Sequence, residues 1–433
     1  AKSSILLRLC PKAKSLWPEC RLKGTIPLSL FVQQVNLHQC RSGTLLEEVP
    51  GIMSDLSDLS KVSHAVTQSS LQPHVSTYFD EHVLKDEIQL LYRDGPGYVG
   101  HTHWVPERGD WRSLPWEGDG RILVNNGSEI ELLSNVCRHR QAIMLKGHGN
   151  SSNIVCPLHR WTYDLKGELL GAPHFAQQPC TKLQSYPLQN WRGLLFNSGR
   201  NVLEDLKKVP FLEEIDFSEF QLDSVKTNVL PYNWKTFIEV YLEDYHVEPF
   251  HPGLGQFVSC SDLQWYYGEN WSVQSVGVKA GLRRPGTPVY KQWHEAVKKF
   301  SNGVEPKYGA IWFCMYPNIM VEWYPHVLVV STLHPQGPQE TLNVVEFYYP
   351  EEIRLFEREF VEAEQAAYME TAVEDDEIAE RMDEGRRVLM ERGEHDAGPY
   401  QSPMEDGMAH FHAWYGAQMN PTHDQSGKLK KTF

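Results

Sequence analysis

The 433-residue chain lacks several features that would assign it to a class of protein at once. Its most apolar run, residues 26–32, is far shorter than the roughly 20 residues that a membrane-spanning helix needs. The net charge of −15 argues against nucleic acid or an anionic membrane as the main partner. The eight cysteines follow no regular pattern, so we expect no disulfide framework and a reducing, cytoplasmic location.

The sequence also contains no Gly-rich dinucleotide fingerprint, no internal repeat and no low-complexity tract. Its length allows two or three domains with a large core, and its composition is that of an ordinary globular protein. We therefore expect a globular chain that does not itself bind a dinucleotide.

Residues 1–52 differ in composition from the rest of the chain. They hold many Lys and Arg, few acidic residues and three cysteines, Cys10, Cys20 and Cys40. This segment is either a leader or an upstream extension that is not functional. We favour the extension, with Met53 as the working start, and expect residues 53–96 to form an N-terminal helical segment.

The pattern of the next 150 residues changes from helical to β-rich. Apolar spacing predicts a helix over residues 78–92, which Gly95-Pro96-Gly97 ends. Asn126-Gly127 predicts a hairpin between two apolar runs. The expected strands are residues 122–124, 130–132, 154–155, 161–165, 168–170 and 194–196.

From about residue 206 the pattern is mixed helix and strand. The expected strands are residues 311–314, 320–323, 328–332 and 342–349. Residues 351–392 predict a long charged helical region, residues 399–403 a loop, and Met408, Phe411 and Trp414 a final helix.

Two short motifs in the β-rich segment carry the strongest chemistry. Cys137-Arg138-His139 and Cys156-Pro157-Leu158-His159 each supply one thiolate and one imidazole. A tetrahedral zinc site could use this set. A Rieske [2Fe–2S] cluster needs this distribution, with two Cys on one iron and two His on the other, and we favour it.

A second candidate site lies in the stretch 233–252. Apolar spacing predicts a helix there, which Pro249 should end, so that His251 folds back towards His246. Two imidazoles converging at a helix end are a candidate metal site. From these residues alone we favour the other interpretation, two unrelated histidines that cap a helix.

These motifs and several later ones resemble, in the same order, the catalytic alpha subunits of the Rieske non-haem iron oxygenases. The likeness runs from about residue 75 to 415. The residues that carry it are Cys137-x-His139, 156–167, Asn233-Trp234-Lys235, 243–246, 251–254, Tyr316-Pro317-Asn318, Tyr324-Pro325-His326, Val373-Glu374-Asp375 with Glu380 and Gly385, and Glu405-Asp406-Gly407 with His410-Phe411-His412.

The resemblance implies an α+β fold in two domains. An all-β Rieske domain, residues 97–205, would be inserted before an α+β catalytic domain, residues 206–433, with a central antiparallel sheet flanked by helices. Cys137, His139, Cys156 and His159 would hold the cluster.

The same resemblance implies a mononuclear Fe(II) held by His246, His251 and Asp375. Asp376 is the second candidate for the carboxylate, whereas neighbouring Glu374 and Glu377 could be a solvated helix face. Two His and one carboxylate leave positions on iron open for O2 and substrate.

Glu243 matches the acidic residue that links the two metal centres in the family. As a glutamate it resembles the choline and carnitine monooxygenases, and it would bond both His246 and His159. Its neighbour Asp244 should lie on another face of the helix and play no part. Val240 stands where many members have Asn, which removes an amide near the iron.

The implied function is the terminal oxygenase component of a multicomponent system. It would use O2, and electrons from a separate NAD(P)H-dependent reductase and a possible ferredoxin, to hydroxylate or demethylate a small organic molecule. An aromatic compound or a quaternary amine is the expected class of substrate, and the family implies a homotrimer. The alternatives are a Rieske-type electron carrier without oxygenase activity and a structural zinc protein.

Aromatic residues are frequent after His251. An aromatic cage could hold a quaternary ammonium by cation–π contact, but most aromatics in such a region belong to the core, which we favour here. The residues concerned are Trp265, Tyr266, Tyr267, Trp271 and Trp293.

Overall fold

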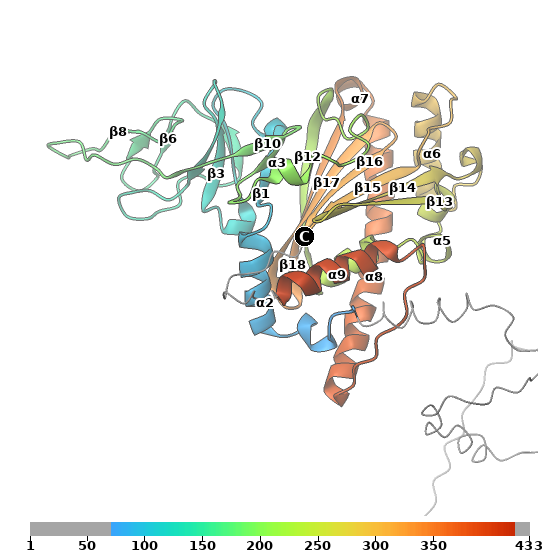
Figure 1. The fold of residues 1–433 in the computed structure, drawn as a ribbon. Coiled ribbons are helices and arrows are strands. Elements are labelled where there is room, and N and C mark those ends of the chain that lie inside the picture. The colour runs from blue at the N-terminus through green and yellow to red at the C-terminus, as the bar shows by residue number, and fades with distance from the viewer. Residues whose placement is uncertain (1–70, 421–433) are drawn as a thin grey trace, which may run out of the picture. The chain divides into compact units, whose positions relative to one another are not determined.

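The computed structural model describes residues 71–420 of the chain (Figure 1). The extension expected at residues 1–52 and the start expected at Met53 lie outside the described residues. Within 71–420 no helix is both long enough and apolar enough to pass through a bilayer.

The described chain begins with three short helical elements. These are η2 (Val75–Tyr78), α2 (Glu81–Glu87) and η3 (Ile88–Arg93), the last of π type. The helix expected over residues 78–92 is confirmed, with a later start. Asp80 caps α2 by accepting a hydrogen bond of 2.7 Å from the N–H of His82, which fixes the first turn.

The β-rich segment forms three small antiparallel sheets. The hairpin predicted at Asn126-Gly127 is confirmed, because β3 and β4 pair on either side of it. The first sheet contains, in spatial order, β1 (Tyr98–His101), β11 (Leu194–Phe196) and β10 (Gln189–Trp191). The second contains β5 (His148–Asn150), β2 (Asp110–Ser113), β3 (Arg121–Asn125), β4 (Ile130–Ser134) and β9 (Ser185–Tyr186). The third contains β6 (Ile154–Val155), β7 (Thr162–Tyr163) and β8 (Leu169–Gly171).

A seven-stranded antiparallel sheet organises the second half of the chain, which confirms the expected central sheet. Its order is β12 (Phe220–Leu230), β18 (Glu340–Pro350), β17 (Val327–Gly337), β16 (Ile319–Tyr324), β15 (Ala310–Met315), β14 (Trp271–Val278) and β13 (Val258–Tyr267). Sequence reasoning missed β12, β13 and β14. β12 lies at an edge of the sheet with most side chains only half buried, so its apolar signal is weak.

Helices cover one face of this sheet. They are α4 (Trp234–Tyr241), α5 (Val247–Phe250), α6 (Pro288–Phe300), α7 (Glu351–Phe356), α8 (Arg358–Arg392) and α9 (Asp406–Met419), with the short turns η6 (Leu254–Gln256) and η7 (Ala280–Leu282) (Figure 1). The expected helical region 351–392 is confirmed, although non-helical backbone at Glu357 divides it into α7 and α8. Sequence reasoning missed α6.

Side chains of β15 alternate between two cores. Ala310 and Trp312 pack with residues of α6 and α8, whereas Ile311 and Phe313 pack with residues of the preceding β-rich segment. Tyr98 and Trp104 of that segment also donate hydrogen bonds of 2.9 and 2.7 Å to the buried Glu346 of β18. The helical face of the sheet is therefore separate from the face towards the β-rich segment.

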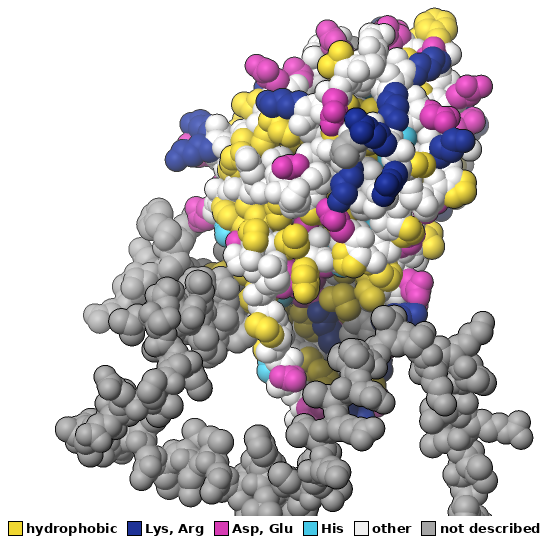
Figure 2. All heavy atoms as spheres, turned by 90° about the vertical axis from the view of Figure 1, so that its right-hand side faces the viewer, with side chains coloured by type: hydrophobic (Ala, Val, Ile, Leu, Met, Phe, Trp, Pro, Cys, Tyr) yellow, Lys and Arg dark blue, Asp and Glu magenta, His cyan; other side chains and the backbone are white. Residues whose placement is uncertain are grey.

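The negative net charge is not spread evenly over the surface. Figure 2 shows Lys and Arg side chains gathered on the face where α6 lies. Exposed basic residues of η7, α6 and the turn between them are Arg283, Arg284, Lys291, Lys298 and Lys299.

Candidate metal centres and cavity

The helix expected to run to Pro249 is shorter than predicted. α4 begins after Asn233, whose side chain accepts a hydrogen bond of 2.9 Å from the N–H of Lys235, and it ends at Tyr241. A turn follows, and then α5 starts after His246. Pro249 lies in the first turn of α5, where the missing N–H of proline costs no hydrogen bond. The fold-back expected at Pro249 thus occurs earlier, between Leu242 and Val247.

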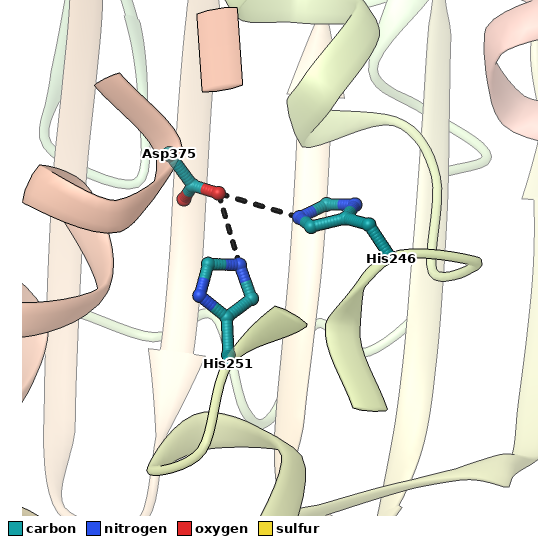
Figure 3. Close-up of side chains that lie close together, drawn as sticks. All are labelled: His246, His251 and Asp375. Atoms are coloured by element: carbon teal, nitrogen blue, oxygen red, sulfur yellow. Dashed lines mark hydrogen bonds and ion pairs between the residues drawn. The ribbon is translucent and has the colours of Figure 1, made fainter. Parts of the chain in front are cut away.

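This turn brings His246 and His251 together beside Asp375 of α8 (Figure 3). Asp375 Oδ1 lies 3.3 Å from Nε2 of His246 and 3.0 Å from Nε2 of His251. One candidate ligand atom from each of the three residues lies within 4.8 Å of the others. Two imidazole nitrogens and one carboxylate oxygen at this spacing fit a non-haem iron site.

The two neighbours of Asp375 are held elsewhere. Asp376 accepts a hydrogen bond of 2.6 Å from the hydroxyl of Tyr232. Glu374 Oε2 lies 2.7 Å from Nδ1 of His251, on the side of the ring opposite Asp375. The geometry therefore favours Asp375 over Asp376, and it gives Glu374 a contact with a histidine in place of the solvated role considered from the sequence.

Negative charge dominates this group of side chains. Burial alone would lower the pKa of His246, but its contacts with Asp375 and Glu243 raise it to about 10. Burial would also lower the pKa of His251, and contacts with Asp375 and Glu374 raise it. The site thus favours bound positive charge, which a metal dication supplies when it displaces the protons.

Glu243 also contacts His246. Its Oε1 lies against Nδ1 of that ring, and its Oε2 accepts a hydrogen bond of 3.0 Å from the backbone N–H of the same residue. The carboxylate side chain is 15% exposed, so solvent or another protein can reach it. A carboxylate on the outer nitrogen of a metal-binding histidine fixes the tautomer and orientation of the ring.

The four residues predicted to hold the cluster differ in how deeply they are buried. The thiols of Cys137 and Cys156 lie in a hydrophobic core, whereas His159 is exposed and His139 is half buried. The Nδ1 atoms of the two imidazoles face each other at 3.1 Å. Buried sulfur ligands with two converging imidazoles nearer the surface fit a Rieske cluster.

Two aromatic residues support the cluster loops. The ring of Trp161 stacks on His139 at 4.9 Å between centroids. The hydroxyl of Tyr163 accepts a hydrogen bond of 3.1 Å from the N–H of Arg138 and lies 3.6 Å from the sulfur of Cys137. Hydrogen-bonding groups near the sulfur tune the potential of such clusters.

A cavity of about 110 Å³ opens beside His246, His251 and Asp375. Its wall includes Val240, the position at which many members of the family have Asn. Aromatic side chains make up much of the rest: Phe237, Tyr241, Phe257, Tyr290, Trp293, Trp312, Tyr324 and Tyr368.

The aromatic residues noted in the sequence have different roles. Trp293 lines the cavity, whereas Trp271 packs in the core between the sheet and the β-rich segment. Trp265 and Tyr267 stack on each other at 6.0 Å, and neither they nor Tyr266 line the cavity. The core interpretation holds for Trp271.

Three buried acids in the cavity wall, Asp244, Glu322 and Glu364, were missed from the sequence. Asp244, expected on another face of the helix, lies in the turn after α4, and its side chain lines the cavity. Glu322 of β16 lines it from the sheet. Burial, with Glu243 nearby, raises the pKa of Asp244 to about 7, and burial raises that of Glu322 to about 7. The expectation that Asp244 lies on another face of the helix is wrong, because α4 ends before it.

Two family models match the chain. A Rieske [2Fe–2S] domain matches residues 96–187, and the catalytic domain of ring-hydroxylating alpha subunits matches residues 214–421. The catalytic match argues against a simple electron carrier, and the Rieske match favours the cluster over zinc.

Among curated proteins, two relatives share the same name, putrescine 2-hydroxylase. The protein from Ralstonia nicotianae is 64% identical over 365 residues, which cover 84% of this chain and 100% of the relative. The protein from Bordetella bronchiseptica is 55% identical over 389 residues, covering 86% and 90%. Chloroplastic choline monooxygenase from Atriplex hortensis is 26% identical over 375 residues, covering 80% and 78%.

Solved structures share the fold. A quaternary ammonium Rieske monooxygenase has a TM-score of 0.67 at 20% identity, covering 80% of this chain and 95% of that one. Naphthalene 1,2-dioxygenase from Rhodococcus has a TM-score of 0.61 at 19% identity, covering 84% and 97%. Alpha subunits of this kind act on small substrates with O2 and receive electrons from separate proteins. The chain belongs to the Rieske non-haem iron oxygenases and is a catalytic alpha subunit with a Rieske [2Fe–2S] cluster and a mononuclear iron.

Proposed function

We propose that this oxygenase hydroxylates carbon 2 of putrescine or of a closely related short diamine. The observation that carries this proposal is the 64% identity to a putrescine 2-hydroxylase over the whole length of that relative. The cavity supports it, because buried acids and aromatic side chains suit a small organic cation.

We propose His246, His251 and Asp375 as the iron ligands. Iron(II) on two His and one carboxylate supplies the chemistry of O2 activation when it is bound. The chain's own contribution is to hold the three ligand atoms next to the cavity and to keep that cavity largely apolar. Glu374 and Glu243 occupy the outer nitrogens of the two imidazoles and so fix which nitrogen faces the iron.

We propose Cys137, His139, Cys156 and His159 as the cluster ligands and Glu243 as the residue between the two centres. Within residues 71–420 no hydrogen bond or ion pair connects either cluster histidine with Glu243, His246 or His251. We therefore propose a homotrimer in which the exposed His159 of one subunit meets the partly exposed Glu243 of the next. This arrangement follows the resemblance stated above.

The remaining parts of the proposal concern partners and domain limits. The electron donor is an NAD(P)H-dependent reductase, with or without a ferredoxin, in the cytoplasm. Residues 53–96, 97–205 and 206–433 form the helical segment, the Rieske domain and the catalytic domain, and residues 1–52 add nothing to the activity.

Substrate-dependent O2 uptake with a surrogate reductase tests the function. Putrescine should stimulate uptake and give a product heavier by one oxygen atom, with the label of ¹⁸O2 on carbon 2 by mass spectrometry. Choline, carnitine and naphthalene should stimulate it much less. A preference for choline or carnitine over putrescine would contradict the proposal.

A further inference from the structure

Buried hydrogen-bond acceptors without partners among the described residues line the cavity. Asp244 is 2% exposed and Gln274 is 1% exposed. Neither carboxylate oxygen of Asp244 has a hydrogen-bond partner among the described residues, and the same is true of Oε1 of Gln274. Buried polar atoms are nearly always satisfied, so these three acceptors indicate donors that come from a bound molecule.

The two side chains approach the same end of α4. Nε2 of Gln274 donates a hydrogen bond of 3.0 Å to the carbonyl oxygen of Tyr241, the last residue of that helix. Asp244 follows Tyr241 by three residues and lines the same cavity. The bond fixes the amide so that its free oxygen, an acceptor, remains available.

A second acid without a cationic partner lies elsewhere in the wall. Glu322 is 4% exposed and accepts hydrogen bonds of 2.7 and 3.3 Å from the hydroxyls of Tyr324 and Tyr368. No Lys, Arg or His within the described residues forms an ion pair with it. A carboxylate accepts about four hydrogen bonds, so it can take further donors.

Strand pairing sets how these groups are arranged. Gln274 of β14 pairs with Trp312 of β15, which pairs with Glu322 of β16. The three side chains therefore lie on the same face of the sheet, in a row across it. Adjacent strands are about 4.8 Å apart, which puts the backbones of Gln274 and Glu322 roughly 10 Å apart with the indole between them.

Trp312 is held in place between the two polar positions. Its Nε1 donates a hydrogen bond of 2.9 Å to the hydroxyl of Tyr324, and the side chain is 6% exposed. The ring thus provides a fixed apolar surface between two groups of acceptors.

We propose that the cavity recognises a linear molecule with a primary ammonium group at each end. One ammonium binds Asp244 and Oε1 of Gln274, the other binds Glu322, and the alkyl chain lies along Trp312. Each primary ammonium brings three N–H donors to the acceptors that lack them. A quaternary ammonium has no N–H, so it would leave Asp244 and Gln274 without partners at a cost.

This inference rests on the proposed diamine hydroxylation and names the residues that select the diamine. It assigns Asp244 and Glu322 as specificity residues. Glu364 is the third buried acid in the wall that has no proposed part at the metal centres. The hydroxyl of Tyr349 donates to it, and it lies on α8, outside the row across the sheet.

The decisive quantity is the affinity for 1,4-diaminobutane relative to the affinity for n-butylamine. This ratio is called the diamine preference below. Calorimetric titrations under anaerobic conditions would measure both dissociation constants for holoenzyme of the wild type, Asp244→Asn and Glu322→Gln. Loss of one partner of a buried charge pair costs about 2–5 kcal/mol, so either substitution should lower the diamine preference by at least about 30-fold. Iron content and the visible spectrum of the cluster establish that each variant is loaded.

Glu346→Gln is the matched control. Glu346 is also a buried acid of the sheet with a pKa near 7, raised by burial, but it faces the β-rich segment and does not line the cavity. Its substitution should leave the diamine preference within about threefold of the wild type. If Asp244→Asn fails to retain iron, Glu322→Gln decides by itself, because both positions are required.

The outcomes separate the inference from the proposed function. Wild-type turnover of putrescine with an unchanged diamine preference in Glu322→Gln would overturn the inference and leave the function standing. Loss of that preference in Glu364→Gln but not in Glu322→Gln would also overturn it. Diamine binding that needs Asp244 and Glu322, without hydroxylation of putrescine, would support the inference and refute the function.

Discussion

At the scale of single residues, we expect Glu243 to act mainly through the side chain of His246. Its carboxylate contacts Nδ1 and the backbone N–H of His246, and it remains 15% exposed. We expect Glu243→Gln to retain both metal centres, because the amide has the same shape. It should lose most turnover, since an amide is a weaker acceptor for an imidazole N–H than a carboxylate is.

Two optical measurements distinguish this role from a structural one. Reduction of the cluster by a chemical donor should stay fast in Glu243→Gln, whereas reoxidation with substrate and O2 should become slow. The control is Glu377→Gln, an exposed carboxylate paired with Arg381 on α8, which should behave as wild type. Normal turnover in Glu243→Gln would rule out the proposed link.

Single substitutions can also test which aspartate, Asp375 or Asp376, is the iron ligand. Asp375→Ala, His246→Ala and His251→Ala should each remove the mononuclear iron and leave the visible spectrum of the cluster intact. Asp376→Ala should retain the iron, because that carboxylate bonds Tyr232. Metal analysis of the four variants checks this, and iron loss confined to Asp376→Ala would reverse the assignment.

At the scale of elements, one buried charge network connects α4, α8 and α9. Glu239 of α4 pairs with Arg386 of α8, and it lies 2.9 Å from Nε2 of His412 of α9. Burial alone would raise the pKa of Glu239, but Arg386 and His412 lower it to about 2. The ionised carboxylate is therefore part of what holds the three helices together.

This pKa predicts an acid limit on stability. A folded-state pKa of about 2 against 4.5 in the unfolded chain stabilises the fold by about 3 kcal/mol above pH 4.5. That contribution is lost as the pH falls from about 4.5 to 2, because the unfolded chain then binds the proton first. Glu239→Gln should lower the thermal midpoint at pH 7, since the half-buried Arg386 loses one of its two carboxylate partners and retains only Asp383.

Thermal unfolding at several pH values checks the sign. The midpoint of the wild type should fall between pH 5 and pH 3 more steeply than that of Glu239→Gln, which has no carboxylate to protonate there. Glu377→Gln, at an exposed ion pair, should follow the wild type. Equal slopes for Glu239→Gln and wild type would show that the network does not titrate in this range.

At the scale of the whole molecule, the two metal centres must cooperate although no bond in residues 71–420 connects them. If the cluster of one subunit serves the iron of the next, mixed oligomers can restore activity. His159→Ala should lack the cluster and His246→Ala should lack the iron, so each variant alone should be inactive. Co-expression of the two with different tags, followed by double purification, should recover part of the activity in assemblies that hold both.

A monomer by light scattering, or inactive mixed assemblies with correct metal content, would contradict the trimer. Mixing two His159→Ala preparations with different tags is the control, and it should give no activity.

The sequence by itself determined the parts of this protein that depend on neighbours in the chain. Cys137, His139, Cys156 and His159 could be predicted as cluster ligands because each Cys–His pair lies within one short loop. The hairpin at Asn126-Gly127 could be predicted because a turn is local. His246 and His251 are also close in the sequence, but their prediction as metal ligands needed the Rieske motif and the family resemblance beside them. Asp375, in a distant acidic run, needed the family resemblance.

Only the tertiary structure decided how distant residues meet. The end of α4 at Tyr241 places Asp244 in the cavity, although an uninterrupted helical pattern predicted otherwise. Glu322 reaches the same cavity through the pairing of β14, β15 and β16, and no local pattern encodes which residues of those strands stand side by side. Local spacing thus predicted most of the proposed metal ligands, whereas strand register and a helix end decided which acids line the cavity.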